Sequence, residues 1–164
     1  MKMKPGSLLS IVTALSVAGA ATAATLPKEG TYDYTACWSG TSSDISFSKT
    51  HSANSYEMTG TIVSKVPGGM FDNNTFRCVG MGSLFAGKNG GGNVCETIDT
   101  DGDKRLAVFA ISSEGKVTRE LITGTGKYEG MTTTSSVTLL GPFPAIKAGT
   151  FQQCNHQSGT YKMK

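Results

Sequence analysis

Three carboxylates, Asp99, Asp101 and Asp103, stand within five residues of the chain. Oxygen-rich runs of this kind are typical of calcium loops. An EF-hand loop also needs a bidentate Glu at its twelfth position and a helix on each side, but the twelfth residue counted from Asp99 is Ala110, within an apolar run. The Asp-Gly step inside the segment is instead a strong hairpin signal. We therefore predict a hairpin turn with exposed aspartates, and we keep calcium binding as the alternative.

A second candidate site is an aromatic face. Residues 32–38 alternate strictly between apolar and polar side chains, as a half-buried strand does. The face that they form could stack on a flat or apolar ligand together with side chains from later strands. The alternative is that the same side chains fill the core of a small barrel, which is just wide enough for either outcome. The candidate ligand-binding residues are Tyr32, Tyr34, Trp38, Tyr56, Met58 and Phe109.

Isolated charges within strands are secondary candidates. Arg119 and Glu57 both lie in segments with strand-like alternation. A charge that points into a barrel needs a partner and often marks function. We expect both to face solvent, and retain Arg119 as a candidate. His51 and His156 lie in polar surroundings without a nucleophile motif, so we expect solvated histidines and assign no catalytic residue.

The elements that would position these residues are strands. Beyond the N-terminal stretch no apolar period of 3.6 persists, and about eight short segments alternate between turn signals. We expect separate strands over 32–38 and 42–50, a flexible loop over 87–92, where four of six residues are glycine, and separate strands over 150–154 and 159–163. This pattern predicts an all-β antiparallel barrel or sandwich.

One glycine-framed segment, Gly124-Thr125-Gly126-Lys127-Tyr128-Glu129-Gly130-Met131, separates two of the expected strands. Gly124 and Gly126 can take the positive φ that a tight hairpin requires, and Gly130 suggests a bulge or bend. We expect a hairpin corner of a curved sheet here, with the following strand ending before Pro142 and Pro144.

All four cysteines lie after the N-terminal stretch, and four cysteines allow three pairings. Closure of a barrel would make the first and last strands neighbours. Under that condition Cys37 would pair with Cys154, and Cys78 with Cys95 across a local hairpin. A metal site is the rival interpretation, but the chain has no CxxC pair.

The first residues read as a secretory signal. Lys2 and Lys4 precede an apolar stretch, and Ala21-Thr22-Ala23 offers a cleavage site. We predict a signal peptide over 1–23, one domain over 24–164, and a periplasmic or extracellular location. Removing two lysines lowers the formal charge from +3 to +1, which does not suggest a nucleic-acid partner. Hydroxyls on both faces of the expected strands argue against stable insertion in a membrane.

The segment over 124–131 resembles a motif near the end of allene oxide cyclase-like and dirigent-like barrels. The surrounding pattern resembles small secreted bacterial proteins of undescribed function with two cysteine pairs. The resemblance implies an eight-stranded, calycin-like or allene oxide cyclase-like barrel whose apolar cavity binds a small reactive molecule. The acidic and polar cavity residues of those enzymes have no matching positions near the N-terminus here, so no catalytic role is carried over.

These observations favour a non-enzymatic exported barrel that binds a small apolar or aromatic molecule and needs no cofactor. The first alternative is an isomerase or cyclase that shapes a reactive substrate inside the barrel, as the resemblance implies. The second is a structural or host-interaction protein, which would have a filled interior and a large exposed apolar patch. The volume and lining of the interior distinguish the three hypotheses.

Overall fold

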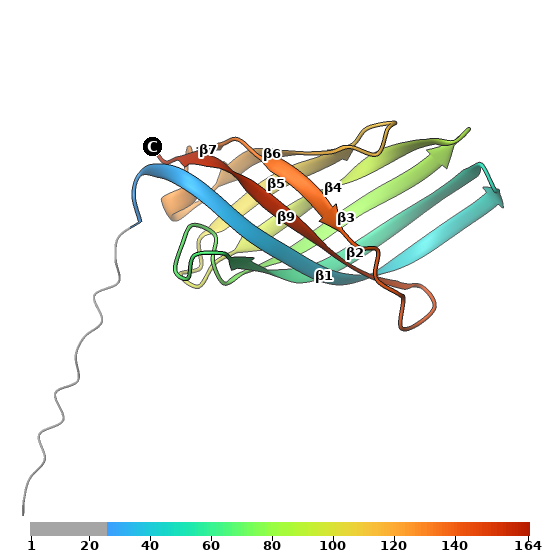
Figure 1. Cartoon of the computed structure of the whole chain (residues 1–164), viewed down its shortest axis with the longest axis horizontal. Helices are drawn as coiled ribbons and strands as arrows, with labels where there is room; N and C mark the ends of the chain where they lie inside the picture. Colours follow the sequence, from blue (N-terminus) through green and yellow to red (C-terminus); the bar gives the residue numbers. More distant parts are fainter. Residues whose placement is uncertain (1–25) are drawn as a thin grey trace, which may run out of the picture.

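A computed structural model describes residues 26–164, so the expected signal peptide lies outside the described residues. The described chain is almost entirely β-structure, with one short 3-10 helix, η1 (Gly126–Tyr128). The strands are β1 (Glu29–Ser48), β2 (His51–Ser64), β3 (Asn74–Phe85), β4 (Lys88–Ile98), β5 (Lys104–Ile111), β6 (Val117–Gly124), β7 (Thr132–Thr133), β8 (Ser136–Leu140) and β9 (Thr150–Lys162). Figure 1 shows them as one curved sheet.

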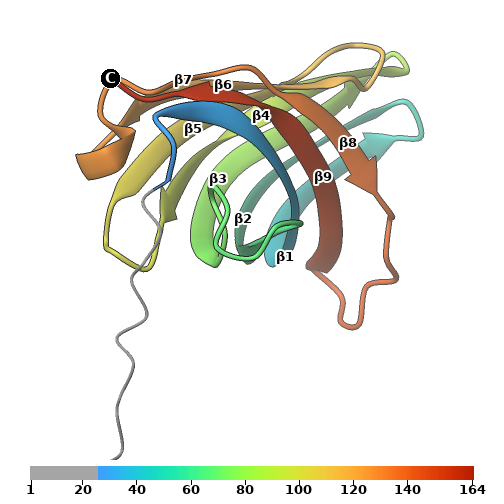
Figure 2. The same cartoon turned by 60° about the vertical axis from the view of Figure 1, so that its left-hand side comes forward.

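The strands form a single antiparallel sheet in the order β6-β5-β4-β3-β2-β1-β9, with β7 and β8 both paired to the free edge of β9. The sheet curls until β6 lies beside β8 (Figure 2). At this seam the strands described here share no backbone ladder, but the Ser135 hydroxyl donates to the Arg119 carbonyl at 3.3 Å. The predicted antiparallel barrel of about eight strands is confirmed, in the form of a half-barrel open along one seam.

Two disulfides tie neighbouring strands, and both have the predicted partners. Cys37 on β1 lies directly opposite Cys154 on β9, and Cys78 on β3 lies opposite Cys95 on β4. The first and last strands are therefore neighbours, as predicted. They pair within the sheet, however, one strand in from the edge formed by β7 and β8, and the seam of the barrel lies between β6 and β8.

Three predicted strand boundaries are wrong. The two strands expected over 32–38 and 42–50 are one strand, β1, which ends at Ser48. The two expected over 150–154 and 159–163 are also one strand, β9, which ends at Lys162. The expected loop at 87–92 is mostly the start of β4. Its glycines allow close packing of strands, because a Cβ on Gly92 would lie 2.2 Å from the Phe109 carbonyl oxygen.

The glycine-framed segment after β6 is a different turn from the one predicted. Gly126 and Gly130 have positive φ, but the chain forms η1 instead of a hairpin. The following strand is broken into β7 and β8, which pair with β9 and not with β6. Strand β8 ends at Leu140, before the two prolines, as predicted.

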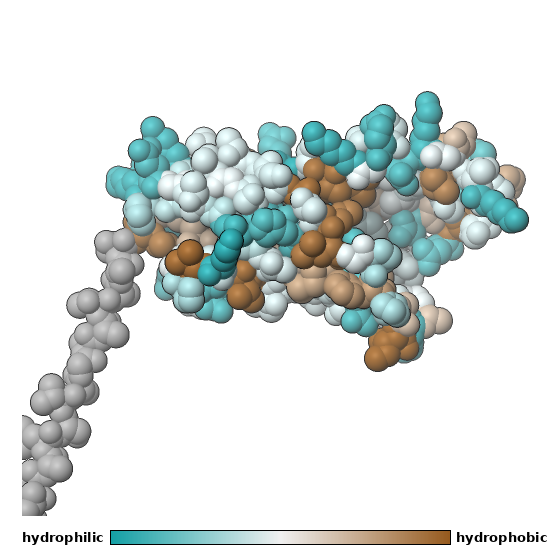
Figure 3. All heavy atoms as spheres, in the orientation of Figure 1, coloured by the Kyte–Doolittle hydropathy of each residue, from teal (hydrophilic) through white to brown (hydrophobic). Residues whose placement is uncertain are grey.

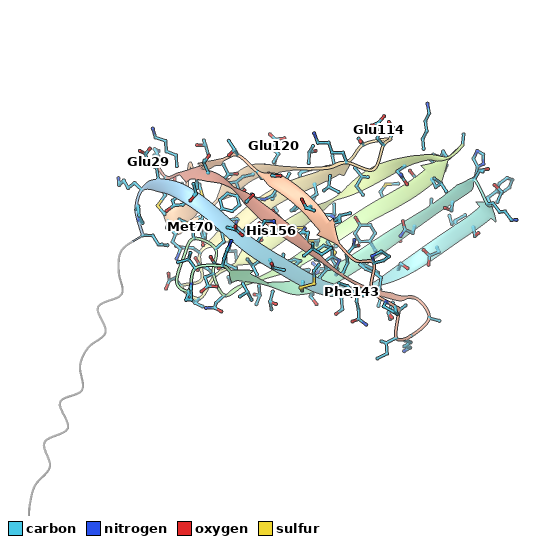
Figure 4. The ribbon with its side chains drawn as sticks, viewed as in Figure 1. Glu29, Met70, Glu114, Glu120, Phe143 and His156 are labelled. Carbon is cyan, nitrogen blue, oxygen red and sulfur yellow. A yellow bond between two sulfur atoms is a disulfide. The ribbon has the colours of Figure 1, made fainter. Side chains whose placement is uncertain are left out.

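Buried side chains close one end of the barrel. Met70 and Phe71, from the connection between β2 and β3, pack against Tyr32, Tyr34 and Tyr128. Figure 4 shows Met70 toward this end and Phe143, on the connection between β8 and β9, toward the other. Among residues 26–164, no helix has the length and apolar character needed to cross a membrane.

Candidate ligand cavity

The inner face of the sheet lines a half-open cavity of about 320 Å³ next to the closed end of the barrel. Strands β1 to β6, β8 and β9 all contribute lining residues. The cavity exists because inward side chains alternate with outward ones along each strand. On β6, for example, Arg119 lines the cavity, whereas Glu120 points away from the barrel (Figure 4).

The wall of the cavity is mainly apolar and includes several aromatic side chains. Tyr56 and Phe151 meet edge to face with centroids 5.8 Å apart, and Trp38 and Phe76 meet similarly at 6.3 Å. The inner disulfide, Cys78–Cys95, is buried in the same wall. The apolar lining includes Trp38, Tyr56, Met58, Phe76, Phe109 and Phe151.

The structure brings six of the seven predicted candidates together around this cavity: Tyr34, Trp38, Tyr56, Met58, Phe109 and Arg119. The seventh, Tyr32, lies in the buried cluster at the closed end. Its hydroxyl donates to the Thr134 carbonyl at 2.7 Å and accepts a hydrogen bond from Arg119 Nη1 at 3.2 Å. Burial raises the pKa of Tyr32, so this phenol stays neutral at physiological pH. The two charged candidates differ: Arg119 lines the cavity, contrary to the expectation, whereas Glu57 faces solvent.

Polar groups gather at the inner end of the cavity, the end that contains Tyr34, Arg105, Asn155 and Gln157. The Tyr34 hydroxyl donates to Gln157 Oε1 at 2.7 Å, and Gln157 Nε2 donates to Asn155 Oδ1 at 3.1 Å. Both amides are buried and line the cavity. Arg105, also buried, lines the same region. The cavity thus has a mostly apolar body, in which Asn54, Asn93 and Gln153 are polar exceptions, and a polar inner end.

Sequence reasoning missed several lining residues, of which Arg105 is the most important. The period of two along β5 could have found it, since Arg105 and Ala107 share the inward face with Phe109. Asn155 and Gln157 were missed because β9 was divided into two segments. Had β9 been taken as continuous, the face that begins at Phe151 would have included both amides.

The remaining candidates lie outside the cavity. Asp99, Asp101 and Asp103 form the β4–β5 turn. Asp99 Oδ1 accepts the backbone N–H groups of the other two, and Lys127 Nζ lies 2.9 Å from Asp99 Oδ2 and 2.6 Å from Asp101 Oδ2. These carboxylates therefore bind a lysine and backbone amides, as a structural turn does. Asp101 is exposed as predicted, but the prediction is wrong for Asp99, whose side chain is only 3% exposed.

Neither histidine is among the residues that line the cavity. His51 is exposed at the start of β2. His156 Nε2 lies 2.7 Å from Asp33 Oδ1 on the outer surface of β1 and β9. This pairing lowers the pKa of Asp33.

Comparisons with protein-family models, curated proteins and solved structures return no match. The resemblance to allene oxide cyclase-like and dirigent-like barrels therefore stays a prediction. What can be concluded about the site comes from its own residues: a half-barrel with an aromatic cavity and a basic, amide-rich inner end.

Proposed function

We propose that this protein is an exported barrel that binds one small apolar or aromatic molecule in its cavity. The observation that carries the proposal is the cavity of about 320 Å³ lined by Trp38, Tyr56, Phe109 and other aromatic side chains. Small-molecule pockets have volumes of roughly 300–1,000 Å³ and consist mostly of apolar surface with a few placed polar groups. This cavity is at the lower end of that range, which fits a ligand of one or two rings.

Rigidity of the wall supports binding. The Tyr56 hydroxyl donates to the Gly92 carbonyl at 3.3 Å and accepts from Asn93 Nδ2 at 3.1 Å, which fixes the ring against Phe151. The disulfide between β3 and β4 restrains the same wall. A ligand that enters therefore orders few side chains, so its binding loses little conformational entropy.

The lining favours binding over the cyclase alternative. A cyclase or isomerase that moves protons is expected to place a buried acid with a shifted pKa beside the aromatic groups. Within residues 26–164, the side chains that line the cavity include no Asp or Glu. Export is supported by the two disulfides, which persist mainly in oxidising compartments.

The binding test uses a reporter that the chain already contains, because Trp38 is its single tryptophan and lines the cavity. The neutral apolar dye N-phenyl-1-naphthylamine accepts excitation energy from tryptophan and brightens in apolar surroundings. We expect saturable quenching of Trp38 with one dye per chain.

Two matched variants locate the binding. Ala107 on β5 points into the cavity, whereas Ala110 on the same strand is exposed. Ala107→Phe fills part of the cavity and should weaken dye binding at least tenfold, whereas Ala110→Phe should leave it unchanged. Equal dye binding by both variants would contradict the proposal.

A further inference from the structure

Arg105 is a buried charge held by neutral groups. It is 3% exposed, and its guanidinium carbon lies 3.8 Å from the centroid of the Phe71 ring and 5.1 Å from that of Tyr128. With the Asn74 amide oriented to satisfy both of its ends, Asn74 Oδ1 accepts from Arg105 Nη2 at 3.1 Å. Arg105 Nε has no partner among the described residues. The aromatic faces offset part of the desolvation cost but leave hydrogen-bonding capacity unused.

This side chain is nevertheless cationic at neutral pH. Burial disfavours the charged form and lowers the pKa of Arg105 from 12.5 to about 10. At pH 7 the protonated form therefore outnumbers the neutral form by about a thousand to one. The cavity has a permanent positive charge at its inner end.

A second guanidinium reinforces this charge. Arg119 also lines the cavity, and its guanidinium carbon lies 6.0 Å from the centroid of the same Phe71 ring. In the described chain no carboxylate is within ion-pair distance of Arg105 or Arg119, whereas Arg77 on the outer face pairs with Glu57 at 2.6 Å. Two arginines of like charge thus converge where the lining supplies no anion.

We infer that the ligand is an anion, an aliphatic or aromatic carboxylate whose charged end lies at Arg105 and Arg119 and whose apolar body lies against the aromatic wall. This inference rests on the proposed function and specifies its ligand class. A carboxylate would provide the missing counter-charge beside the two guanidinium groups in a poorly solvated site, where charge-assisted hydrogen bonds are strongest. A neutral ligand of the same shape would leave both cations uncompensated.

The test compares an acid with its neutral amide, 2-naphthaleneacetic acid and 2-naphthaleneacetamide, which have nearly the same shape. Affinities come from Trp38 quenching and from calorimetry at pH 7. We expect the acid to bind at least tenfold more tightly than the amide to the unmodified protein. We expect this preference to shrink to about twofold or less in Arg105→Met. The matched control is Arg77→Met on the outer face, which should keep the full preference for the acid.

A second variant and a stability measurement separate ligand recognition from a structural role. If Arg105→Met does not fold, Arg119→Met provides the same test at a half-buried position. It should also reduce the preference for the acid over the amide. Removing a buried charge without a counter-ion should maintain or raise the melting temperature in Arg105→Met, whereas loss of a purely structural arginine would lower it.

The outcomes distinguish the two levels of the proposal. If the amide and N-phenyl-1-naphthylamine bind but the acid gains no affinity, or if its advantage survives in both arginine variants, the inference about an anion is wrong and the proposed binding function stands. If none of the three compounds binds, the proposed function fails and the inference fails with it.

Discussion

The ring of Phe71 meets the ring of Tyr32 edge to face, with centroids 5.0 Å apart. This contact joins the connection after β2 to β1. It is part of a plug of buried side chains, Tyr32, Tyr34, Met70, Phe71 and Tyr128, at the closed end of the barrel. Phe71 is 2% exposed and adopts a φ of 70°, which is unusual for a bulky residue. Packing around its ring must therefore offset the backbone strain, which typically costs about 1–3 kcal/mol.

We expect Phe71→Ala to lower the free energy of unfolding by about 3–5 kcal/mol, because it removes a buried ring that contacts three tyrosines and Arg105. Urea denaturation measures this loss. Phe47, which is 86% exposed near the end of β1, is the control, and Phe47→Ala should change stability by less than about 0.5 kcal/mol. Similar losses in both variants would show that Phe71 does not anchor the plug.

Asp72 holds the segment that presents Phe71, and it predicts a pH dependence. Its carboxylate accepts the backbone N–H groups of Gly68 and Ser64, each at 2.8 Å. These bonds, that of Gly68 foremost, lower the pKa of Asp72 below its ordinary value of 3.8. The stabilisation is therefore complete well above pH 3.8 and is lost as the pH falls through the lower, folded-state pKa.

We expect Asp72→Asn to cost about 1–3 kcal/mol at pH 7, since it removes the charge from two hydrogen bonds. The difference from the unmodified protein should shrink as the pH falls below 3.8, which melting curves between pH 2 and pH 7 would measure. A difference that stays constant over this range would contradict the role assigned to the carboxylate.

Removal of each disulfide should have a different effect on the stability of the protein and on its affinity for the dye. Their cysteines are separated by 117 residues in Cys37–Cys154 and by 17 in Cys78–Cys95. In the chain-entropy account, losing the first costs nearly 5 kcal/mol and losing the second about 3 kcal/mol. Only the second lies in the cavity wall.

Paired alanine substitutions test this difference by denaturation and by dye titration. Cys37→Ala with Cys154→Ala should lower stability more, yet leave the affinity for N-phenyl-1-naphthylamine within about twofold while the protein is folded. Cys78→Ala with Cys95→Ala should weaken dye binding, because the wall loses its restraint. The reverse pattern would show that the inner disulfide does not shape the cavity.

Much of the fold could be predicted from local patterns. The alternation at 32–38 indicated the inward face of β1, and the expectation that the first and last strands are neighbours gave both cysteine pairs correctly. Strand ends were less predictable, because glycine signals both turns and close strand packing. At Gly92 the close approach of the Phe109 carbonyl requires the missing side chain, and this is a tertiary contact that composition does not reveal.

The sequence predicted those cavity residues whose side-chain type is ordinarily buried. Aromatic residues such as Trp38 and Tyr56 were expected on the inner face and line the cavity. Arg105 was missed because an arginine in a strand is ordinarily exposed. Its burial depends on contact with the Phe71 ring, which belongs to the connection between β2 and β3. That ring reaches Arg105 only because the connection packs into the closed end of the barrel.

Exposed apolar side chains offer a different place for an apolar probe. Phe143 and Ile146 are exposed on the connection between β8 and β9, where Figure 3 shows hydrophobic surface at the tip. Phe47 and Phe85 are exposed as well, at the ends of β1 and β3. A probe bound at these positions would not report on the cavity, so the location of the probe is as informative as its affinity.

The most direct measurement is therefore a crystal structure of the protein with N-phenyl-1-naphthylamine. The account predicts one dye molecule inside the barrel, with its rings against Trp38, Tyr56 and Phe109 and its edge toward Arg105. An interior without dye, with the dye found only against Phe47, Phe143 or Ile146 on the outer surface, would contradict it.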